Sequence, residues 1–385
     1  MDPFDPPSEP IAIRPLPVLR ATIDALDREV LRLLARRNGI VAEIAEYKRE
    51  HRLEIRDLQR EREILDDRCA RAAQLGLSPA LIESLFRLIL WASRDRQAAL
   101  RAEVPPDTPP RTVAVIGGKG GMGRRMAELF SDLGHTVMVA DVDTRLKPQE
   151  AASVADVVVI SVPIDVTVDL IRALGPFVRR DALLMDVTSV KAAPMQAMLQ
   201  ASTASVVGTH PLFGPSVHSL QGQRIVLTPG RGGEWLAWLK QMLHARGLTM
   251  LETTPEEHDR AMAVVQVLTH FSTEVLGRTL SQLGMPIEQT LAFTSPIYLM
   301  ELLMTARHFA QSPDLYAAIE MSNPATPEVT AAFLESAGRL REIVTSGDRE
   351  GFGEVFAQVR EFLGSFTVRA LQESDFLIDR LVERA

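Results

Sequence analysis

The chain has 385 residues, 46% of them hydrophobic and 24% charged, and its formal net charge is −8. This length exceeds what one small hydrophobic core requires, so more than one domain is expected. The acidic balance excludes a general attraction to nucleic acid or to anionic membranes, and any basic site must therefore be local.

The compartment can be inferred from what the sequence lacks. Its single cysteine, Cys69, excludes an internal disulfide and favours a reducing environment. No apolar run approaches the about 20 residues that span a bilayer. The N-terminus MDPFDPPSEP is acidic and proline-rich, unlike a signal peptide. We expect a cytoplasmic protein that contacts neither membrane nor nucleic acid, with residues 1–15 as a disordered tail.

Residues 16–101 have helical apolar spacing throughout, and the stretch VPPDTPP that follows breaks any helix. We predict an all-α domain over 16–101 and a linker over 102–110. Charged residues interrupt its apolar stripes. Arg37 fills a gap in the stripe of the first helix, and Lys48 lies at its edge. In a second helix, starting near Asp57, Glu61 stands between two leucines and shares a face with Asp57 and Arg60.

The third predicted helix repeats this pattern, because Ser93 and Gln97 interrupt its stripe. Each residue alone can be a surface residue with its head group in water. Taken together, cationic donors with an acid and an amide suit a small anion that carries hydroxyl or ether oxygens. Arg20 lies seventeen residues before Arg37, roughly 25 Å along one helix. If both bind one small ligand, one of them comes from a partner subunit.

The stretches LRATIDALDREVLRLLARRNGIVAEIAEYK, RDLQRERE and SRDRQ resemble the all-helical chorismate mutase domain, a dimer of long helices with shared active sites. A Claisen rearrangement needs no nucleophile and no proton transfer, only a compact conformer and donors aimed at the ether oxygen. The resemblance implies that the substrate carboxylates are held by Arg20 of the partner subunit, Arg37 and Arg60, and that Ser93 also contacts a carboxylate. It implies that Lys48 and Gln97 donate hydrogen bonds to the ether oxygen. It further implies that Asp57 and Glu61 engage the hydroxyl.

From residue 111 to 254, short β-branched runs alternate with helical stretches, which predicts βαβ units on a parallel sheet. The pattern G-x-G-x-x-G falls at Gly118, Gly120 and Gly123, directly after the run TVAVI and at the start of a helix. Such glycines let the backbone approach a pyrophosphate. Asp141, about twenty residues on, favours NAD over NADP by binding a ribose hydroxyl. Arg145 nearby leaves NADP open.

Three further motifs, SVPIDVT, DVTSVK and GTHPLFGP, each follow an apolar run. They place Ser161, Ser189 and His210 at the carboxyl ends of strands, where doubly wound sheets bind their ligands. Ser161 is expected at the cofactor. Of the eight histidines, His210 is the best candidate for a base because of its position between Gly208 and Pro211 at a strand end.

Residues 255–385 are predicted to be helical, a substrate and dimerisation domain. The motifs above, with EEHDRAMAVVQVLTHF and SPIYLMELLMTARHFAQSPDLY, resemble prephenate dehydrogenase, and the whole chain resembles the bifunctional T-protein family. The resemblance implies that prephenate is oxidised by NAD without a metal, that His210 accepts the proton of its ring hydroxyl, and that Ser189 supports that hydroxyl. It further implies that Arg307 binds a substrate carboxylate, that His270 lies near the substrate or an inhibitory tyrosine, and that the chain forms a homodimer.

Two other functions fit the sequence. A dehydrogenase that prefers arogenate differs only in binding an amine where prephenate has a ketone. A regulatory protein that senses NAD without catalysis would use the first segment only for dimerisation, which leaves the charged residues at positions 37 and 61 unexplained. One departure from the family lies inside the glycine-rich loop, where Lys119 can alter phosphate contacts or cofactor preference.

Overall fold

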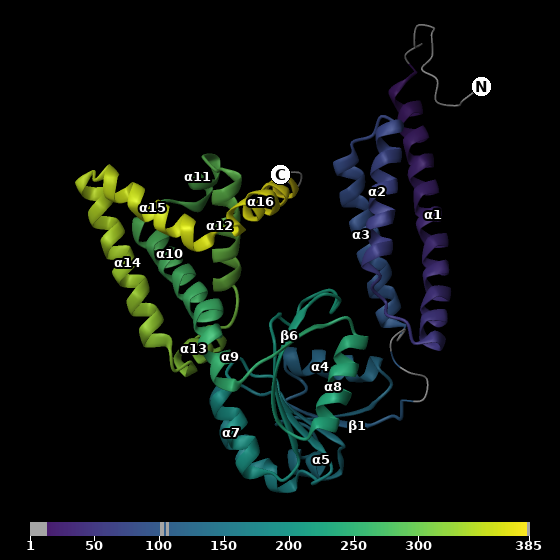
Figure 1. Cartoon of the computed structure of the whole chain (residues 1–385), viewed down its shortest axis with the longest axis vertical. Coiled ribbons are helices and arrows are strands. Elements are labelled where there is room, and N and C mark those ends of the chain that lie inside the picture. Colours follow the sequence, from purple (N-terminus) through teal and green to yellow (C-terminus); the bar gives the residue numbers. More distant parts are fainter. Residues whose placement is uncertain (1–13, 101–103, 105–107, 383–385) are drawn as a thin grey trace.

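The computed structural model describes residues 14–100, 104 and 108–382. The predicted tail therefore lies almost wholly outside the described residues, and the predicted linker lies partly outside them. Three regions follow one another along the chain, a group of three helices, a sheet covered by helices on both faces, and a second group of helices (Figure 1). This order confirms the predicted fold class.

The first region consists of α1 (Leu16–His51), α2 (Leu58–Gln74) and α3 (Pro79–Ala99). The side chain of Asp57 caps α2 by accepting a hydrogen bond from the backbone of Arg60, which fixes the predicted start of this helix. α1 is much longer than its two neighbours (Figure 1). Its apolar stripe is open in the single chain, since Ile23, Leu26 and Val30 are each more than half exposed. A stripe of this length is stable in water only when another surface covers it.

The central region carries one seven-stranded sheet in the order β2-β1-β3-β4-β5-β6-β7. Its strands are β1 (Thr112–Ile116), β2 (Thr136–Ala140), β3 (Val157–Ile160), β4 (Leu183–Asp186), β5 (Ser205–Pro211), β6 (Arg224–Arg231) and β7 (Thr249–Glu252). The prediction of a wholly parallel sheet is wrong at one place, because β6 runs antiparallel to β5. The connection between these strands, residues 212–223, contains no crossover helix, and without one the chain can only turn back beside β5.

Helices cover both faces of this sheet. They are α4 (Gly121–Asp132), α5 (Pro148–Val154), α6 (Ile164–Leu174), α7 (Ala192–Ala201) and α8 (Gly233–Ala245). Side chains alternate between the faces along each strand. Val113 and Val115 belong to the core under α4 and α8, whereas Ala114 and Ile116 belong to the core under α5, α6 and α7. All four are almost fully buried, so the sheet is a rigid base for the loops at its carboxyl edge.

The last region is entirely helical over its described residues. Its helices are α9 (Pro255–Met262), α10 (Thr269–Leu283), α11 (Ile287–Ala292), α12 (Pro296–Phe309), α13 (Pro313–Ser322), α14 (Thr326–Ser346), α15 (Arg349–Leu363) and α16 (Phe366–Val382). A π-helical turn, Ala263–Leu268, joins α9 to α10. Among the described residues, no helix combines the length and the apolar character that a bilayer span requires.

Candidate active sites

The first candidate site lies among the three N-terminal helices, around the buried face of α3. Ser93 and Gln97 are each only 6% exposed, although both are polar. The Ser93 hydroxyl donates to the carbonyl of Ile89 at 2.6 Å and accepts a hydrogen bond from the guanidinium of Arg37 on α1. The Gln97 amide nitrogen donates to the carbonyl of Ser93 at 3.2 Å. Three predicted site residues from two helices are thus in one connected group.

Lys48 reaches the same region from the last turn of α1. Its ammonium donates to the carbonyl oxygens of Glu54 and Ile55, both at 2.7 Å, in the loop that leads to α2. Two backbone acceptors fix a flexible side chain that would otherwise sample many rotamers. The charge of Lys48 is therefore placed by the loop.

Positive charge is concentrated around this group. Glu61 on α2 is half-buried and accepts a hydrogen bond from Arg94 on α3, and the guanidinium of Arg56 lies 3.9 Å from its other oxygen. Burial, and after it the nearby charge of Arg68, lowers the pKa of Arg37. Like charges that approach each other are stabilised by an anion between them. The region is accordingly suited to a small anion.

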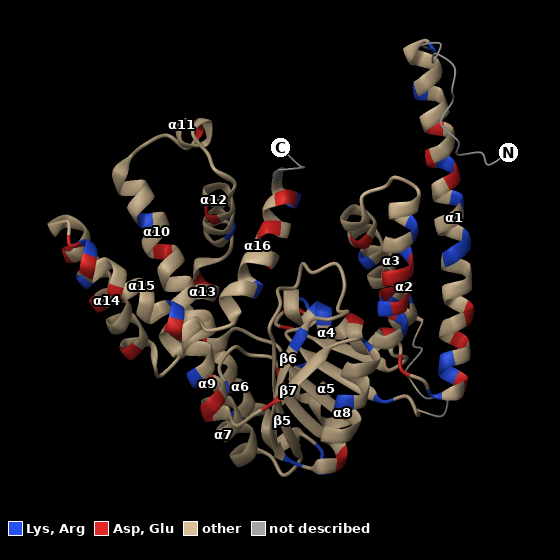
Figure 2. Cartoon of the chain, turned by 45° about the horizontal axis from the view of Figure 1, so that its top comes forward, with Lys and Arg blue, Asp and Glu red and all other residues tan. Residues whose placement is uncertain are grey.

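Other predicted residues are not brought into this group. Asp57 and Arg60 are exposed, although an inward orientation was expected with Glu61. The Asp57 carboxylate is engaged in capping α2, and Arg60 pairs along the helix with Glu63 at 3.2 Å. Arg20 is exposed near the start of α1, far from Arg37 along the same helix. Charged residues of both signs lie along α1 and α2 (Figure 2).

The second candidate site lies at the carboxyl edge of the sheet, where the strand order reverses between β1 and β3. Ile116, Ala140 and Ile160 stand side by side at the ends of β1, β2 and β3. The residues that follow them are Gly117, Asp141 and Ser161. The predicted cofactor residues therefore meet at one edge, as in other doubly wound sheets.

The glycines of this edge allow a close approach of the loop, the strand and the helix that a side chain would prevent. A Cβ at Gly118 would lie 2.8 Å from the side chain of Val139, and one at Gly123 would lie 2.2 Å from the carbonyl oxygen of Gly117. Gly117 itself has a φ of +79°. Gly120 precedes the first turn of α4, whose free N–H groups point toward the loop. These features fit the pyrophosphate of a dinucleotide.

Asp141 is held in place by the loop that it faces. Its carboxylate accepts the backbone N–H of Lys119 at 2.9 Å and that of Val142 at 2.8 Å. The Lys119 ammonium does not face this carboxylate but pairs with Asp143 at 2.7 Å. Each carboxylate oxygen retains a lone pair for a further donor, so Asp141 can still bind a ribose hydroxyl.

Two other predicted residues follow neighbouring strands. Asp186 at the end of β4 is paired with Gly208 of β5, two residues before His210. Ser189 is half-buried in the turn after β4. His210 is the penultimate residue of β5 and is only 2% exposed. Ser189 and His210 are thus at the same edge as the cofactor residues.

The surroundings of His210 include residues that the sequence reasoning missed. Its Nδ1 lies 2.9 Å from Nε2 of His258 on α9, and Nδ1 of His258 lies 2.8 Å from the carboxylate of Asp259. On its other side, the amide nitrogen of Gln266 lies 3.4 Å from Nε2 of His210. Gln266 belongs to the π-helical turn, a distortion that is frequent at functional sites.

A buried ion pair supports the strand that carries His210. The ammonium of Lys191 is fully buried, pairs with Asp186 and donates to the carbonyl of Thr209 at 2.7 Å. Burial is the main cause that lowers the pKa of His210 well below its usual value of 6.5, followed by the electrostatic effects of its neighbours His258 and Lys191. His210 is therefore neutral at pH 7, as a base must be before it accepts a proton.

The predicted residues Arg307 and His270 lie in the C-terminal region. Arg307 is exposed on α12. The half-buried ring of His270 meets Tyr316 edge to face, with ring centroids 4.8 Å apart. Burial and the neighbouring Glu274 raise the pKa of Glu320 to about 7. The structure shows no contact between Arg307 and His210, and the roles expected for Arg307 and His270 stay predictions.

Some of the missed residues had a signal in the sequence. Arg94 directly follows Ser93 and lies three residues before Gln97, which places it beside the same helix face. His258 and Asp259 are adjacent polar residues whose burial, 1% and 4% exposed, depends on α9 packing against the end of the sheet. That packing is not encoded in local spacing.

Together, the fold and these sites define an NAD-type dehydrogenase that is joined to an all-helical, anion-binding domain. Each region matches a known protein family. Residues 19–98 match the family described as "Chorismate mutase type II", residues 128–251 match "Prephenate dehydrogenase, nucleotide-binding domain", and residues 254–358 match "Prephenate dehydrogenase, dimerization domain". The T-protein of Enterobacter agglomerans is 36% identical over 94% of this chain and 97% of its own length. The T-protein of Haemophilus influenzae is 33% identical over 94% and 96%. The chain belongs to the T-protein family.

A solved structure supports the fold of the dehydrogenase part. The prephenate dehydrogenase of Aquifex aeolicus, in complex with hydroxyphenyl propionate and NAD+, has a TM-score of 0.54 to this chain. The two are 19% identical, and the match covers 66% of this chain and 97% of the other. At this identity the likeness concerns the fold alone.

Proposed function

We propose that the chain converts chorismate to prephenate in its helical domain and oxidises prephenate with NAD to 4-hydroxyphenylpyruvate at the edge of its sheet. It is a bifunctional enzyme of tyrosine biosynthesis, a chorismate mutase joined to a prephenate dehydrogenase. The observation that supports the division of labour is the contrast in chemistry: the guanidinium of Arg37 contacts the buried Ser93 in the helical domain, whereas a buried neutral histidine lies at the edge of the sheet that also carries the glycine-rich loop.

In the mutase reaction, we assign Arg37 and Arg60, with Arg20 of the partner subunit, to the two carboxylates of chorismate. Lys48 and Gln97 would donate hydrogen bonds to the ether oxygen as negative charge develops there, and Ser93 orients Arg37. Asp57 and Glu61 would bind the hydroxyl. The reaction forms one carbon–carbon bond and breaks one carbon–oxygen bond, so placed donors and a compact substrate are sufficient.

In the dehydrogenase reaction, Nε2 of His210 takes the proton of the C4 hydroxyl, and Ser189 supports that oxygen. When bound, NAD accepts the hydride that leaves C4. The bond to the ring carboxylate then breaks, CO₂ leaves, and its electron pair makes the ring aromatic. No net proton is released, because the proton on His210 returns to the ring oxygen as the phenol forms. Arg307 would bind a substrate carboxylate.

We also propose that the enzyme is a cytoplasmic homodimer. The exposed apolar stripe of α1 supports a contact through the first region, and the exposed Phe293, Met321 and Phe362 support another through the last. A dimer of this kind brings Arg20 of the partner subunit toward Arg37 of the first chain. Tyrosine as an inhibitor bound near His270 is part of the same proposal.

A coupled assay tests this function. Pure protein is given chorismate and NAD, and reduced cofactor is followed by absorbance while chorismate loss is followed separately. We expect both signals. Prephenate with NAD, in the absence of chorismate, should give reduced cofactor without the mutase reaction. Arogenate in place of prephenate, at equal concentration, measures substrate preference. If neither chorismate loss nor reduced NAD is observed, the proposed function is wrong.

A further inference from the structure

A row of three buried side chains leads away from His210 on the side opposite Gln266. His210, His258 and Asp259 are 2%, 1% and 4% exposed, and the two hydrogen-bonding distances that join them are 2.9 Å and 2.8 Å. Water has little access to any of them. The position of each proton in the row is therefore decided by the neighbouring groups.

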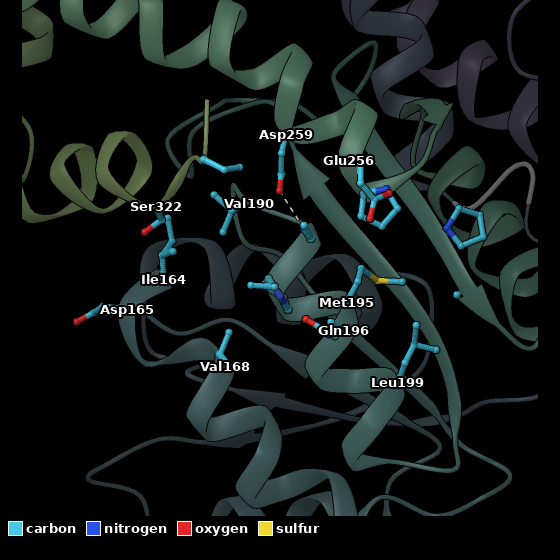
Figure 3. Close-up of a pocket in the computed structure, with 17 residues that line it drawn as sticks. Ile164, Asp165, Val168, Val190, Met195, Gln196, Leu199, Glu256, Asp259 and Ser322 are labelled. Atoms are coloured by element: carbon cyan, nitrogen blue, oxygen red, sulfur yellow. Dashed lines mark hydrogen bonds between the residues drawn. The ribbon is translucent and has the colours of Figure 1, made fainter. Parts of the chain in front are cut away.

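The Asp259 end of the row can only accept hydrogen bonds. Its oxygens accept the backbone N–H groups of Lys191 at 2.7 Å and Ala192 at 3.0 Å, at the start of α7. Figure 3 shows Asp259 reaching the end of this helix from the wall of a groove of about 900 Å³. Burial alone would raise the pKa of Asp259, but the hydrogen bonds from His258 and from this backbone outweigh burial and lower it. Asp259 is a carboxylate.

The remaining protons follow from this charge. Because the carboxylate accepts from Nδ1 of His258, that nitrogen carries a proton, and in a neutral ring Nε2 is then an acceptor. Nδ1 of His210, 2.9 Å away, donates to it in this arrangement. Nε2 of His210 is left with a lone pair, which faces the amide nitrogen of Gln266. This is the nitrogen to which the substrate proton is assigned.

We propose that His258 and Asp259 are positioning residues for the dehydrogenase reaction, which hold His210 in the tautomer with a bare Nε2 and stabilise its imidazolium after proton transfer. The inference rests on the proposed role of His210 as the base. An aspartate that orients a catalytic histidine in serine proteases acts by the same principle, but here a second histidine stands between the carboxylate and the base.

Substitutions of His258 test the proposal by kinetics. His258→Leu removes the acceptor, and we expect the dehydrogenase kcat to fall about 100-fold, within the range known for general-base catalysis. KM for prephenate and for NAD should change little. His258→Gln keeps an amide oxygen to accept from His210 and an amide N–H to donate to Asp259, so it should recover most of kcat. A loss that is equal in both variants, or no loss in His258→Leu, would overturn the proposal.

A measurement on the unaltered chain avoids the risk that a variant does not fold. With 15N-labelled histidine, NMR distinguishes a protonated ring nitrogen from a bare one, and the His210 signals are assigned by their absence in His210→Asn. We expect the proton on Nδ1, and a proton fixed on Nε2 instead would contradict the proposal.

The same set of variants separates this inference from the proposed function. If His210→Asn retains dehydrogenase activity, the assignment of the base is wrong. If His210→Asn is inactive while His258→Leu is fully active, only the positioning role is wrong. Chorismate turnover, measured in every variant, reports whether the helical domain has folded, and an unchanged KM for NAD reports this for the sheet domain. The exposed His244 on α8 provides a matched control as His244→Leu.

Discussion

The mutase and dehydrogenase regions differ in how much of a site one chain completes. Around His210, the hydrogen-bonded groups are buried and come from the sheet and from α9 of the same chain. Around Ser93, Arg37 and Gln97 are in place, but Arg60 is exposed and Arg20 lies at the far end of α1. The dehydrogenase site is organised before any association, whereas the mutase site has part of its charge, Arg20 and Arg60, on an exposed surface.

This difference follows from the two reactions. Proton transfer requires one nitrogen to be placed accurately in a dry environment, which a rigid sheet edge provides. A Claisen rearrangement requires several charges to surround a dianion, and charges can be supplied by two chains. We therefore expect the dehydrogenase to depend on single buried residues and the mutase to depend on assembly.

The largest expected effect is that of His210→Asn. Without the ring nitrogen that accepts the proton, dehydrogenase kcat should fall about 1,000-fold, since general-base catalysis typically contributes about 100- to 10,000-fold. Chorismate turnover should stay near its original value. The two rates are measured on the same preparation, with His244→Asn as a control histidine on the surface of α8. A parallel loss of both activities would mean that the two sites are not separable.

Lys48→Ala is expected to have the converse effect. Removal of a donor aimed at developing charge typically costs about 100-fold in rate, so chorismate turnover should fall by that order. Prephenate oxidation should be unchanged, because Lys48 lies on α1 in the helical domain and donates to the loop before α2. Arg32→Ala, which removes an exposed ion pair with Glu29 on the same helix, is the matched control. Normal mutase activity in Lys48→Ala would remove Lys48 from the site.

Subunit mixing tests the open character of the mutase site directly. Arg20→Ala and Lys48→Ala chains are each expected to lack mutase activity. In a mixed dimer, one of the two sites regains both residues, so random exchange should restore roughly a quarter of the original activity. The measurement is chorismate loss after exchange, with mixed dimers confirmed by two different tags. Confirmed exchange without recovery would show that Arg20 acts within its own chain or not at all.

Much of the dehydrogenase edge could be predicted because its signals are local. Gly118, Asp141, Ser161 and His210 each stand at a fixed offset from an apolar run, and parallel strands bring such offsets to one edge. The antiparallel direction of β6 was not predicted, because an apolar run such as RIVLT does not show the direction in which its strand runs. His258 and Asp259 were missed for a related reason, since their role exists only once α9 packs on the sheet.

The mutase residues were harder to predict in detail. Helical spacing correctly indicated that Ser93 and Gln97 face the interior and that Arg37 needs a partner. The same spacing placed Asp57 and Arg60 inward, where the structure has them exposed. Spacing identifies the face of a helix but not what covers that face. For α1 and α2, we propose that the cover is supplied by the partner subunit.

The smallest expected effect is a difference between the two pH profiles. Burial first, then His258 and Lys191, lowers the pKa of His210 well below 6.5, so the neutral, active form persists as the pH falls through 6.5. The dehydrogenase kcat/KM for prephenate should therefore stay level from pH 8 to 6.5 and decline only at lower pH, where His210 becomes protonated. Chorismate turnover involves no proton transfer and should lack this decline. A decline of dehydrogenase activity that begins at or above pH 6.5 would contradict the buried environment of His210. An identical decline in the mutase profile would mean that both activities are lost because the protein unfolds.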